Sequence, residues 1–169
     1  MEAVIFMGLQ GAGKSTFYKE RYFATHVRIN LDMLKTRNRE SRLLKTCLEI
    51  GQPFVVDNTN PTRAERIVYI AAAREAGFRV VGYYFQSRLE DCKRRNEQRP
   101  VEQQVPWKGL LGTAGRRELP RRDEGFDALF YVRIEDTAGE ASRFVVEDFS
   151  EAFSEVFSED SSEDRDDEV

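Results

Sequence analysis

The stretch "GLQGAGKST", residues 8–16, decides the fold of this 169-residue chain. It fits the pattern G-x-x-x-x-G-K-[S/T] and follows the apolar run "AVIFM", residues 3–7, which is typical of a strand. Glycines in the loop permit backbone conformations in which successive N–H groups point inward at an anion. A helix expected from about Lys14 to Tyr22 adds the positive end of its dipole. This strand, turn and helix predict a phosphate-binding loop.

The polar residues of the loop specify the ligand further. A lysine in this place supplies a positive charge for the β- and γ-phosphates, and the hydroxyl that follows it is a ligand for Mg²⁺. A merely structural glycine turn would not explain Lys14 and Ser15. We therefore expect ATP, or another nucleoside triphosphate, together with Mg²⁺. The expected nucleotide contacts in the loop are Gly8, Gly11, Ala12, Gly13, Lys14, Ser15 and Thr16.

Strand-like runs alternate with helical patterns along the rest of the chain. The further strands are expected in "HVRIN", "PFVVD", "FRVVGYYF" and "EGFDALFYVRI". One helical pattern starts near Asp32 and reaches Gly51, a second is opened by Pro61, and a third covers "RLEDCKRRNEQR". Strands that alternate with crossover helices predict a three-layer α/β fold, with a parallel sheet flanked by helices.

Length and composition limit the class of protein. The chain is long enough for one domain, and no run approaches the roughly 18 apolar residues that would span a membrane. The N-terminus lacks the basic region of a secretory signal. Cys47 and Cys92 are far apart and have no metal-ligand spacing, so we expect them to be reduced. A cytoplasmic protein without membrane contact is the expectation.

The net charge of −4 averages two unlike regions. Residues 147–169 hold eleven acidic residues and one arginine, which leaves residues 1–146 with 25 of the 26 basic and 19 of the 30 acidic residues. A basic body suits a polyanionic partner. We expect an acidic amphipathic helix over residues 138–157 and a disordered acidic tail over 158–169, either of which could bind a protein partner.

Three further features favour a small P-loop kinase. Asp32 follows the second expected strand, and Asp57 ends the third. The arginines of "KRRNEQR" precede residues 100–120, which lack a core pattern and suit a mobile lid, so that a lid of about 94–120 completes a domain of 1–137. No N-K-x-D stretch is present for guanine recognition, and the chain is short for a ring ATPase.

Five segments carry a specific resemblance. They are "GLQGAGKSTF", "INLD", "VVDNTNPTRAERIVYI", "RRNEQR" and "ELPRRDEGF". Through them the chain resembles the kinase domain of polynucleotide 5′-hydroxyl kinases, the P-loop enzymes of nucleic-acid end healing, over nearly all of residues 3–134. The resemblance implies transfer of the γ-phosphate to a 5′-hydroxyl end of RNA or DNA. It also implies that Asp32 accepts the proton of that hydroxyl, and that Arg99 grips the ATP phosphates with Arg95 close by.

The resemblance implies further contacts around these residues. Asp32, Lys35 and Asp57 are the expected acceptor-binding residues, and Ser15 and Asp57 are the expected metal site. An acid at a strand end beside the phosphate loop typically holds a Mg²⁺-bound water or an arginine. The stretch from Asn58 to Asn60 could equally be a polar turn that caps the next helix. Phage-type members have an arginine in place of Lys35, and a lysine cannot form the same bidentate fork.

Several alternatives stay open from the sequence. Asp32 could be a helix cap instead of a general base, and Trp107 could stack on a base or pack the lid against the body. The chain could also be a small-molecule kinase that acts on a nucleoside or sugar. A third reading is a nucleotide-gated binding module with little turnover. The basic stretch from Lys35 to Lys45 disfavours a small neutral acceptor, and an acceptor base such as Asp32 disfavours a switch.

Overall fold

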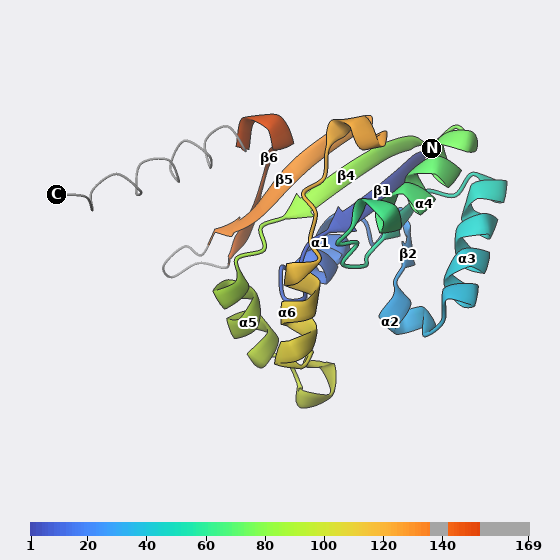
Figure 1. Ribbon diagram of the computed structural model, residues 1–169. Coiled ribbons are helices and arrows are strands. Elements are labelled where there is room, and N and C mark those ends of the chain that lie inside the picture. Colours follow the sequence, from blue (N-terminus) through green and yellow to red (C-terminus); the bar gives the residue numbers. More distant parts are fainter. Residues whose placement is uncertain (136–141, 153–169) are drawn as a thin grey trace.

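A six-stranded sheet lies at the centre of the protein and carries helices on both faces (Figure 1). The structure is a computed structural model, and it describes residues 1–135 and 142–152. The first five strands in sequence are parallel, and β6 runs antiparallel to β5, in the order β2-β3-β1-β4-β5-β6. The strands are β1 (Glu2–Met7), β2 (Val27–Ile29), β3 (Phe54–Val56), β4 (Arg79–Phe85), β5 (Ala128–Glu135) and β6 (Arg143–Asp148). The predicted, mainly parallel sheet is therefore confirmed.

The helices form a layer on each side of this sheet. Leu44 of α3 and Ile70 of α4 pack with Ile5 on one face. Phe17 of α1 and Leu110 of α6 pack on the other face. The helices are α1 (Lys14–Arg21), α2 (Leu31–Leu34), α3 (Arg37–Ile50), α4 (Arg63–Glu75), α5 (Leu89–Glu97) and α6 (Trp107–Gly115), with 3₁₀ turns η1 (Val101–Gln103) and η2 (Arg122–Glu124). This is the predicted three-layer arrangement.

The central strand β1 explains why the core forms on both faces. It lies between β3 and β4, and its residues 3–7 are almost completely buried. Val4 and Phe6 contribute to one apolar cluster, whereas Ala3, Ile5 and Met7 contribute to the other. A parallel strand covered on both faces needs an unbroken apolar run, which is what the sequence shows. The strand then delivers the phosphate loop at its carboxyl end.

The expected helix from Asp32 to Gly51 is wrong in one respect, because the chain forms two helices there. Lys35 has a φ of 70° and ends α2. The side chain of Thr36 then accepts a hydrogen bond from Arg39 N and caps α3. A left-handed residue followed by a new N-cap cannot continue a helix. The predicted end at Gly51 is confirmed.

One helix boundary and one buried residue also differ from the prediction. Helix α4 begins at Arg63 behind the N-cap Thr62, so Pro61 precedes the helix instead of opening it. Residues 100–120, which lack a core pattern in the sequence, nevertheless contain α6, whose Leu110 is only 1% exposed. One buried leucine in nine residues gives a weak periodic signal. The mobility of the lid stays a prediction.

The predicted acidic helix over residues 138–157 is wrong for Arg143–Asp148, which form the edge strand β6. Phe144 and Val146 pack against the α1 side of the sheet. Cross-strand ion pairs between β5 and β6 join Arg133 to Glu147 and Arg143 to Glu135. The predicted tail, 158–169, lies outside the described residues. In the part of the chain that is described, no helix has the length and apolar character needed to cross a membrane.

Candidate active site at the carboxyl edge of the sheet

The phosphate loop is wedged so tightly that glycine is required at two positions. Gly11 and Gly13 have φ values of 84° and 93°, in the left-handed region. A Cβ on Gly11 would lie 2.4 Å from the carbonyl oxygen of Cys92, and one on Gly13 would lie 2.8 Å from Ile134 Cδ1. Within the described chain, the backbone N–H groups of Gly11, Gly13 and Lys14 donate no hydrogen bond. They are therefore available to an anion at the start of α1.

Lys14 is folded back over this loop. Its Nζ donates hydrogen bonds to the carbonyl oxygens of Gly8, at 2.8 Å, and Leu9, at 2.7 Å. The side chain is buried, and this desolvation lowers the pKa of Lys14 to about 8, although nearby Asp57 acts in the opposite direction. A phosphate group would supply the negative charge that the two carbonyl groups supply only in part.

Two neighbouring cavities meet at the loop. The larger one, of about 520 Å³, is lined by Gly11, Gly13, Thr16, Arg95, Arg99, Ile134 and Phe144, among others. The smaller one, of about 190 Å³, is lined by Gly11, Gly13, Lys14, Ser15, Asp32, Asp57 and Arg99, among others. Gly11, Gly13 and Arg99 belong to both. The predicted site residues of the loop, α2, β3 and α5 are thus brought to one place, except that Gly8, Ala12 and Lys35 line neither cavity.

Asp32 lies in the first turn of α2 and lines the smaller cavity. Its carboxylate makes no hydrogen bond or ion pair with any residue in the described ranges. The cap of α2 is Asn30, whose side chain accepts from Met33 N at 3.0 Å. The alternative reading of Asp32 as the helix cap is therefore wrong. Its exposed carboxylate is instead available to a bound molecule.

The polar turn after β3 fixes the position of α2. Asn30 donates from its side chain to the backbone oxygen of Asp57, and Leu31 N donates to Asn58 Oδ1 at 2.8 Å. On its other side, Thr59 O accepts from Gly8 N at 3.0 Å. The polar turn therefore bonds to α2 on one side and to the phosphate loop on the other. It does not cap the next helix, because the cap of α4 is Thr62.

Asp57 is the most buried acid at the site and is 2% exposed. Its Oδ2 accepts from Ser15 Oγ at 2.9 Å and from Arg28 Nε at 2.8 Å. Arg28 Nη2 also donates to Ser15 Oγ at 2.8 Å. Sequence reasoning missed Arg28 as a site residue, although an arginine inside the apolar strand β2 was a signal.

The oxygens of Ser15 and Asp57 fit the metal ion that the fold implies. Mg²⁺ prefers oxygen ligands at about 2.1 Å in an octahedron, and adjacent ligand oxygens then lie about 2.9 Å apart. Ser15 Oγ and Asp57 Oδ2 lie 2.9 Å apart. Mg²⁺ commonly takes only one or two protein ligands beside phosphate oxygens and waters.

One side chain braces the expected lid internally, and another joins it to the phosphate loop. Asn96 exchanges two hydrogen bonds with the backbone of Val105, at 2.8 and 3.0 Å. Gln10 Nε2 donates to Thr113 Oγ1 of α6 at 3.1 Å. Within "RNEQR" the asparagine is thus structural, and Arg95 and Arg99 point to the cavities that they line. Trp107 lies beneath Lys93 and lines neither cavity.

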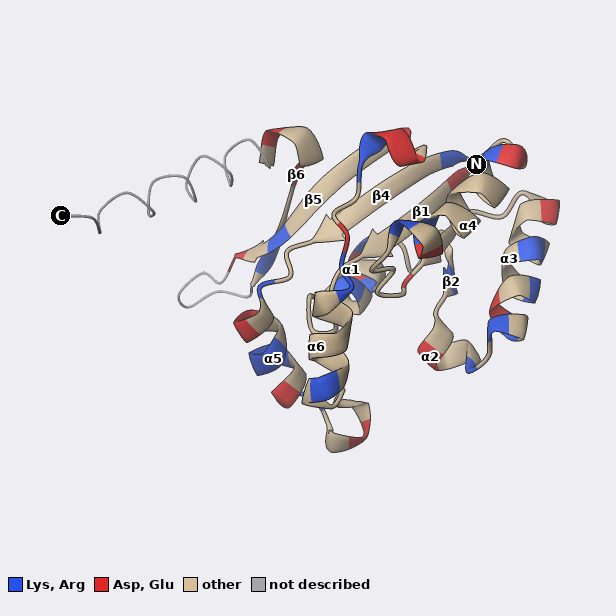
Figure 2. Ribbon diagram, viewed as in Figure 1, with Lys and Arg blue, Asp and Glu red and all other residues tan. Residues whose placement is uncertain are grey.

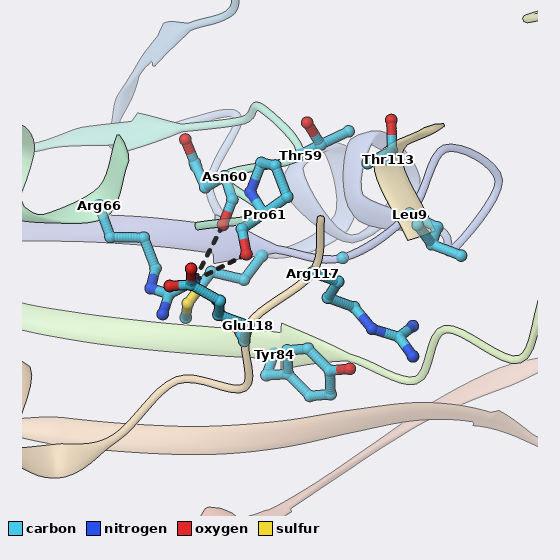
Figure 3. A pocket seen from close by; sticks show the side chains of 11 residues that line it. Leu9, Thr59, Asn60, Pro61, Arg66, Tyr84, Thr113, Arg117 and Glu118 are labelled. Atoms are coloured by element: carbon cyan, nitrogen blue, oxygen red, sulfur yellow. Dashed lines mark hydrogen bonds between the residues drawn. The ribbon is translucent and has the colours of Figure 1, made fainter. Parts of the chain in front are cut away.

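A buried ion pair anchors the chain where it leaves the lid. Arg66 donates to Glu124 through two bonds of 2.7 Å, and both side chains are 1% exposed. Arg66 also donates to the backbone oxygens of Asn60, Pro61 and Glu118 (Figure 3). The segment "ELPRRDEGF" therefore clamps the lid to the polar turn. The carboxylate of Glu124 pairs with Arg66, and that of Glu118 accepts a hydrogen bond from Arg63 N at 2.8 Å.

Comparisons with known proteins find similar sequences and folds. The sequence model of a family described as "AAA domain" matches residues 34–116, just under half of the chain. A bifunctional polynucleotide phosphatase/kinase of Schizosaccharomyces pombe is 29% identical over 129 residues, which are 74% of this chain. That match spans 32% of the relative, so the chain covers about a third of its length.

Two solved structures have the same fold. Kti12 of Chaetomium thermophilum, in complex with ADP-AlF3, aligns over 80% of this chain and 90% of its own, with a TM-score of 0.61 and 16% identity. A gluconokinase of Sinorhizobium meliloti aligns over 80% and 84%, with a TM-score of 0.57 and 18% identity. At these identities the likeness concerns the fold alone.

Proposed function

The chain has the P-loop kinase fold and resembles polynucleotide kinases in sequence, and from this premise we propose that it transfers the γ-phosphate of ATP to the 5′-hydroxyl of a nucleic-acid end. The observation that carries the proposal is the meeting of two cavities at Gly11, Gly13 and Arg99. One cavity has the groups that bind a triphosphate, and the other has an available carboxylate. A phosphoryl group between them would contact both reactants.

The larger cavity suits the donor nucleotide. The free N–H groups of Gly11 and Gly13 face the phosphates there, and Arg95 and Arg99 add charge from α5 and the residues after it. Lys14 would reach the terminal phosphates from the smaller cavity, which it lines. Ile134 and Phe144 add apolar surface to this cavity next to Gly13 of the loop. The donor's terminal phosphate then faces the smaller cavity. Mg²⁺, when bound at Ser15 and Asp57, neutralises charge that develops on the phosphates.

The smaller cavity suits the acceptor hydroxyl. Asp32 accepts the proton as the hydroxyl oxygen bonds to the γ-phosphorus, while the bond from that phosphorus to the β-phosphate oxygen breaks. Lys14 and Arg99 stabilise the charge that passes to the leaving diphosphate. The rest of the acceptor polynucleotide extends away from the reacting hydroxyl, and the protein surface beside the smaller cavity must accommodate its phosphates.

Helix α3 provides a surface for those phosphates. Arg39, Arg42 and Lys45 are exposed on it, and Figure 2 shows basic residues along its length. Lys35 lies between α2 and α3 and does not line the small cavity, so in this proposal it contacts the acceptor's backbone and not its reacting end. Contacts of this kind position a polynucleotide without reading its sequence.

A small-molecule kinase is the second candidate. The acceptor cavity of about 190 Å³ admits only a small group, which is compatible with a whole small molecule as well as with one nucleotide end. The gluconokinase shares the fold. The basic face of α3 favours the polynucleotide, because a small neutral acceptor leaves that face without a role.

One experiment separates the two candidates. The protein is incubated with γ-labelled ATP and Mg²⁺ beside RNA and DNA oligonucleotides with 5′-hydroxyl ends, the same oligonucleotides with 5′-phosphate ends, nucleosides and gluconate. We expect label only on the 5′-hydroxyl oligonucleotides, and none with the Asp32→Asn variant. Label confined to nucleosides or sugars would replace the proposal with the second candidate, and label on no acceptor would refute both.

A further inference from the structure

Arg28 occupies the place where a metal ion would join Ser15 to Asp57. Its guanidinium lies within 2.8 Å of Ser15 Oγ, and its Nη2 lies 2.5 Å from Asp57 Oδ2. It therefore donates to the same two oxygens whose separation fits Mg²⁺. The ring of Tyr18 lies beneath the guanidinium at 5.5 Å and supports it from below.

The buried carboxylate needs a positive partner at all times. The Asp57 side chain is 1% exposed, and an unpaired charge at such a depth is strongly destabilising. Arg28, whose side chain is 26% exposed, provides that partner from β2. Mg²⁺ at the same oxygens would provide more positive charge in the same place. Two cations this close repel each other, so their binding to the pair is coupled.

The inference rests on the proposed function, because it takes Ser15 and Asp57 as the metal-binding pair. We propose that Arg28 competes with Mg²⁺ for this pair, so that the metal ion binds together with the nucleotide and not ahead of it. Two protein oxygens that already hold a guanidinium form a weak metal site. The phosphate oxygens of the nucleotide add ligands and negative charge, which shift the competition toward the metal ion.

The test measures metal binding without any turnover. Mn²⁺, an ion that takes similar oxygen ligands, is titrated into the protein and its free form is followed by electron paramagnetic resonance. We expect weak binding to the nucleotide-free wild type. Arg28→Met and Arg28→Gln should each bind Mn²⁺ more tightly, on the order of tenfold, because one repelling charge is removed. Gln keeps a hydrogen-bond donor beside Asp57, which protects the fold if the Met variant does not express.

The nucleotide provides a second readout. In the wild type, ADP should raise the affinity for Mn²⁺ by a larger factor than in either variant, since only the wild type has an arginine to displace. The melting temperature should show the same relation. Without metal, Arg28→Gln should melt below the wild type, and Mn²⁺ should raise the melting temperature of the variant by more than it raises that of the wild type.

Two controls isolate the effect. Arg79→Met removes an exposed arginine of β4 that pairs with half-buried Glu2, and it should leave Mn²⁺ affinity unchanged. Adding Asp57→Asn to Arg28→Gln should abolish the gain. The proposal is overturned if both Arg28 variants bind Mn²⁺ no more tightly than the wild type, in which case the arginine holds Asp57 without opposing the metal. Because no acceptor is present, failure of the acceptor panel would leave this result standing.

Discussion

At the residue scale, the exposed carboxylate of Asp32 carries the proposed chemistry. Asp32→Asn removes the proton acceptor but keeps the size of the side chain. We expect nucleotide affinity to stay near that of the wild type, because α2 is capped by Asn30 and not by Asp32. Phosphoryl transfer should fall by a factor on the order of 10² to 10⁴, the usual range for loss of a general base. Equilibrium binding of ATP and single-turnover kinetics check the two parts, and unchanged turnover would contradict the role.

Arg95 and Arg99 differ in the cavities that they reach, and this difference predicts different kinetics. Arg99 borders both cavities, whereas Arg95 borders only the larger one. Arg99→Ala should lower kcat strongly, because it removes charge where the phosphoryl group transfers. Arg95→Ala should mainly raise KM for ATP. Initial-rate kinetics of the two variants provide the measurement, and the reverse pattern would show that the assignment of the two arginines is wrong.

The lowered pKa of Lys14 predicts a pH dependence of nucleotide binding. Burial in the free protein brings this pKa to about 8, below the usual value for lysine, so the neutral form accumulates as the pH rises through 8. A triphosphate favours the charged form, and its binding must then take up a proton. We expect ATP affinity to fall between pH 7 and pH 9, by up to about tenfold per pH unit above 8.

Calorimetry in two buffers of different ionisation enthalpy measures that proton uptake directly. Lys14→Arg is the matched control, because a guanidinium keeps its proton throughout this range. The ATP affinity of Lys14→Arg should change less between pH 7 and pH 9 than that of the wild type. A wild-type affinity that does not change up to pH 9 would contradict the lowered pKa.

At the scale of elements, the buried pair of Arg66 and Glu124 joins α4 to the chain that follows the lid. Glu124→Gln leaves a buried guanidinium without its charged partner. We expect the free energy of unfolding to fall by about 3 to 5 kcal/mol, the range measured for broken buried ion pairs. Urea denaturation followed by circular dichroism checks this. Arg74→Met is the control, since its pair with Asp127 is exposed and should contribute only about 0 to 1 kcal/mol.

Elements with strong local signals were predictable, and elements set by competing signals were not. The apolar runs of β1 and β4 and the glycine stop of α3 each point to one structure. Residues 143–149 point to two structures, because the spacing of Phe144 and Val146 fits a strand while that of Val145 and Phe149 fits a helix. Antiparallel pairing with the edge of β5 makes residues 143–148 a strand. That pairing depends on the tertiary structure, so the local sequence does not predict it.

The same distinction applies to the site. Lys14, Ser15, Asp32 and Asp57 could be placed together because parallel strands bring their carboxyl ends to one edge. The bond from Arg28 to Asp57 joins residues 29 positions apart and depends on the side of β2 from which the arginine projects. The position of Lys35 outside the small cavity also follows from a left-handed turn that no propensity predicts.

At the scale of the whole molecule, the distribution of charge predicts an effect of the C-terminal tail. Residues 158–169 contain seven acidic residues and one arginine, whereas residues 1–146 are basic overall. A tethered segment acts at an effective concentration in the millimolar range, so weak electrostatic contacts with the basic body can compete with a polynucleotide. Such contacts weaken with salt, because the Debye length is only about 8 Å near physiological ionic strength.

We therefore expect that removal of residues 158–169 lowers the apparent KM for a 5′-hydroxyl oligonucleotide at low salt and leaves kcat nearly unchanged. The difference should shrink as salt is added. A tail of the same length, with Gln for Glu and Asn for Asp, separates charge from bulk, and it should behave as the deletion does. Steady-state kinetics at two salt concentrations provide the measurement. If KM at low salt is the same for all three proteins, the acidic tail does not compete with the acceptor and acts only on solubility.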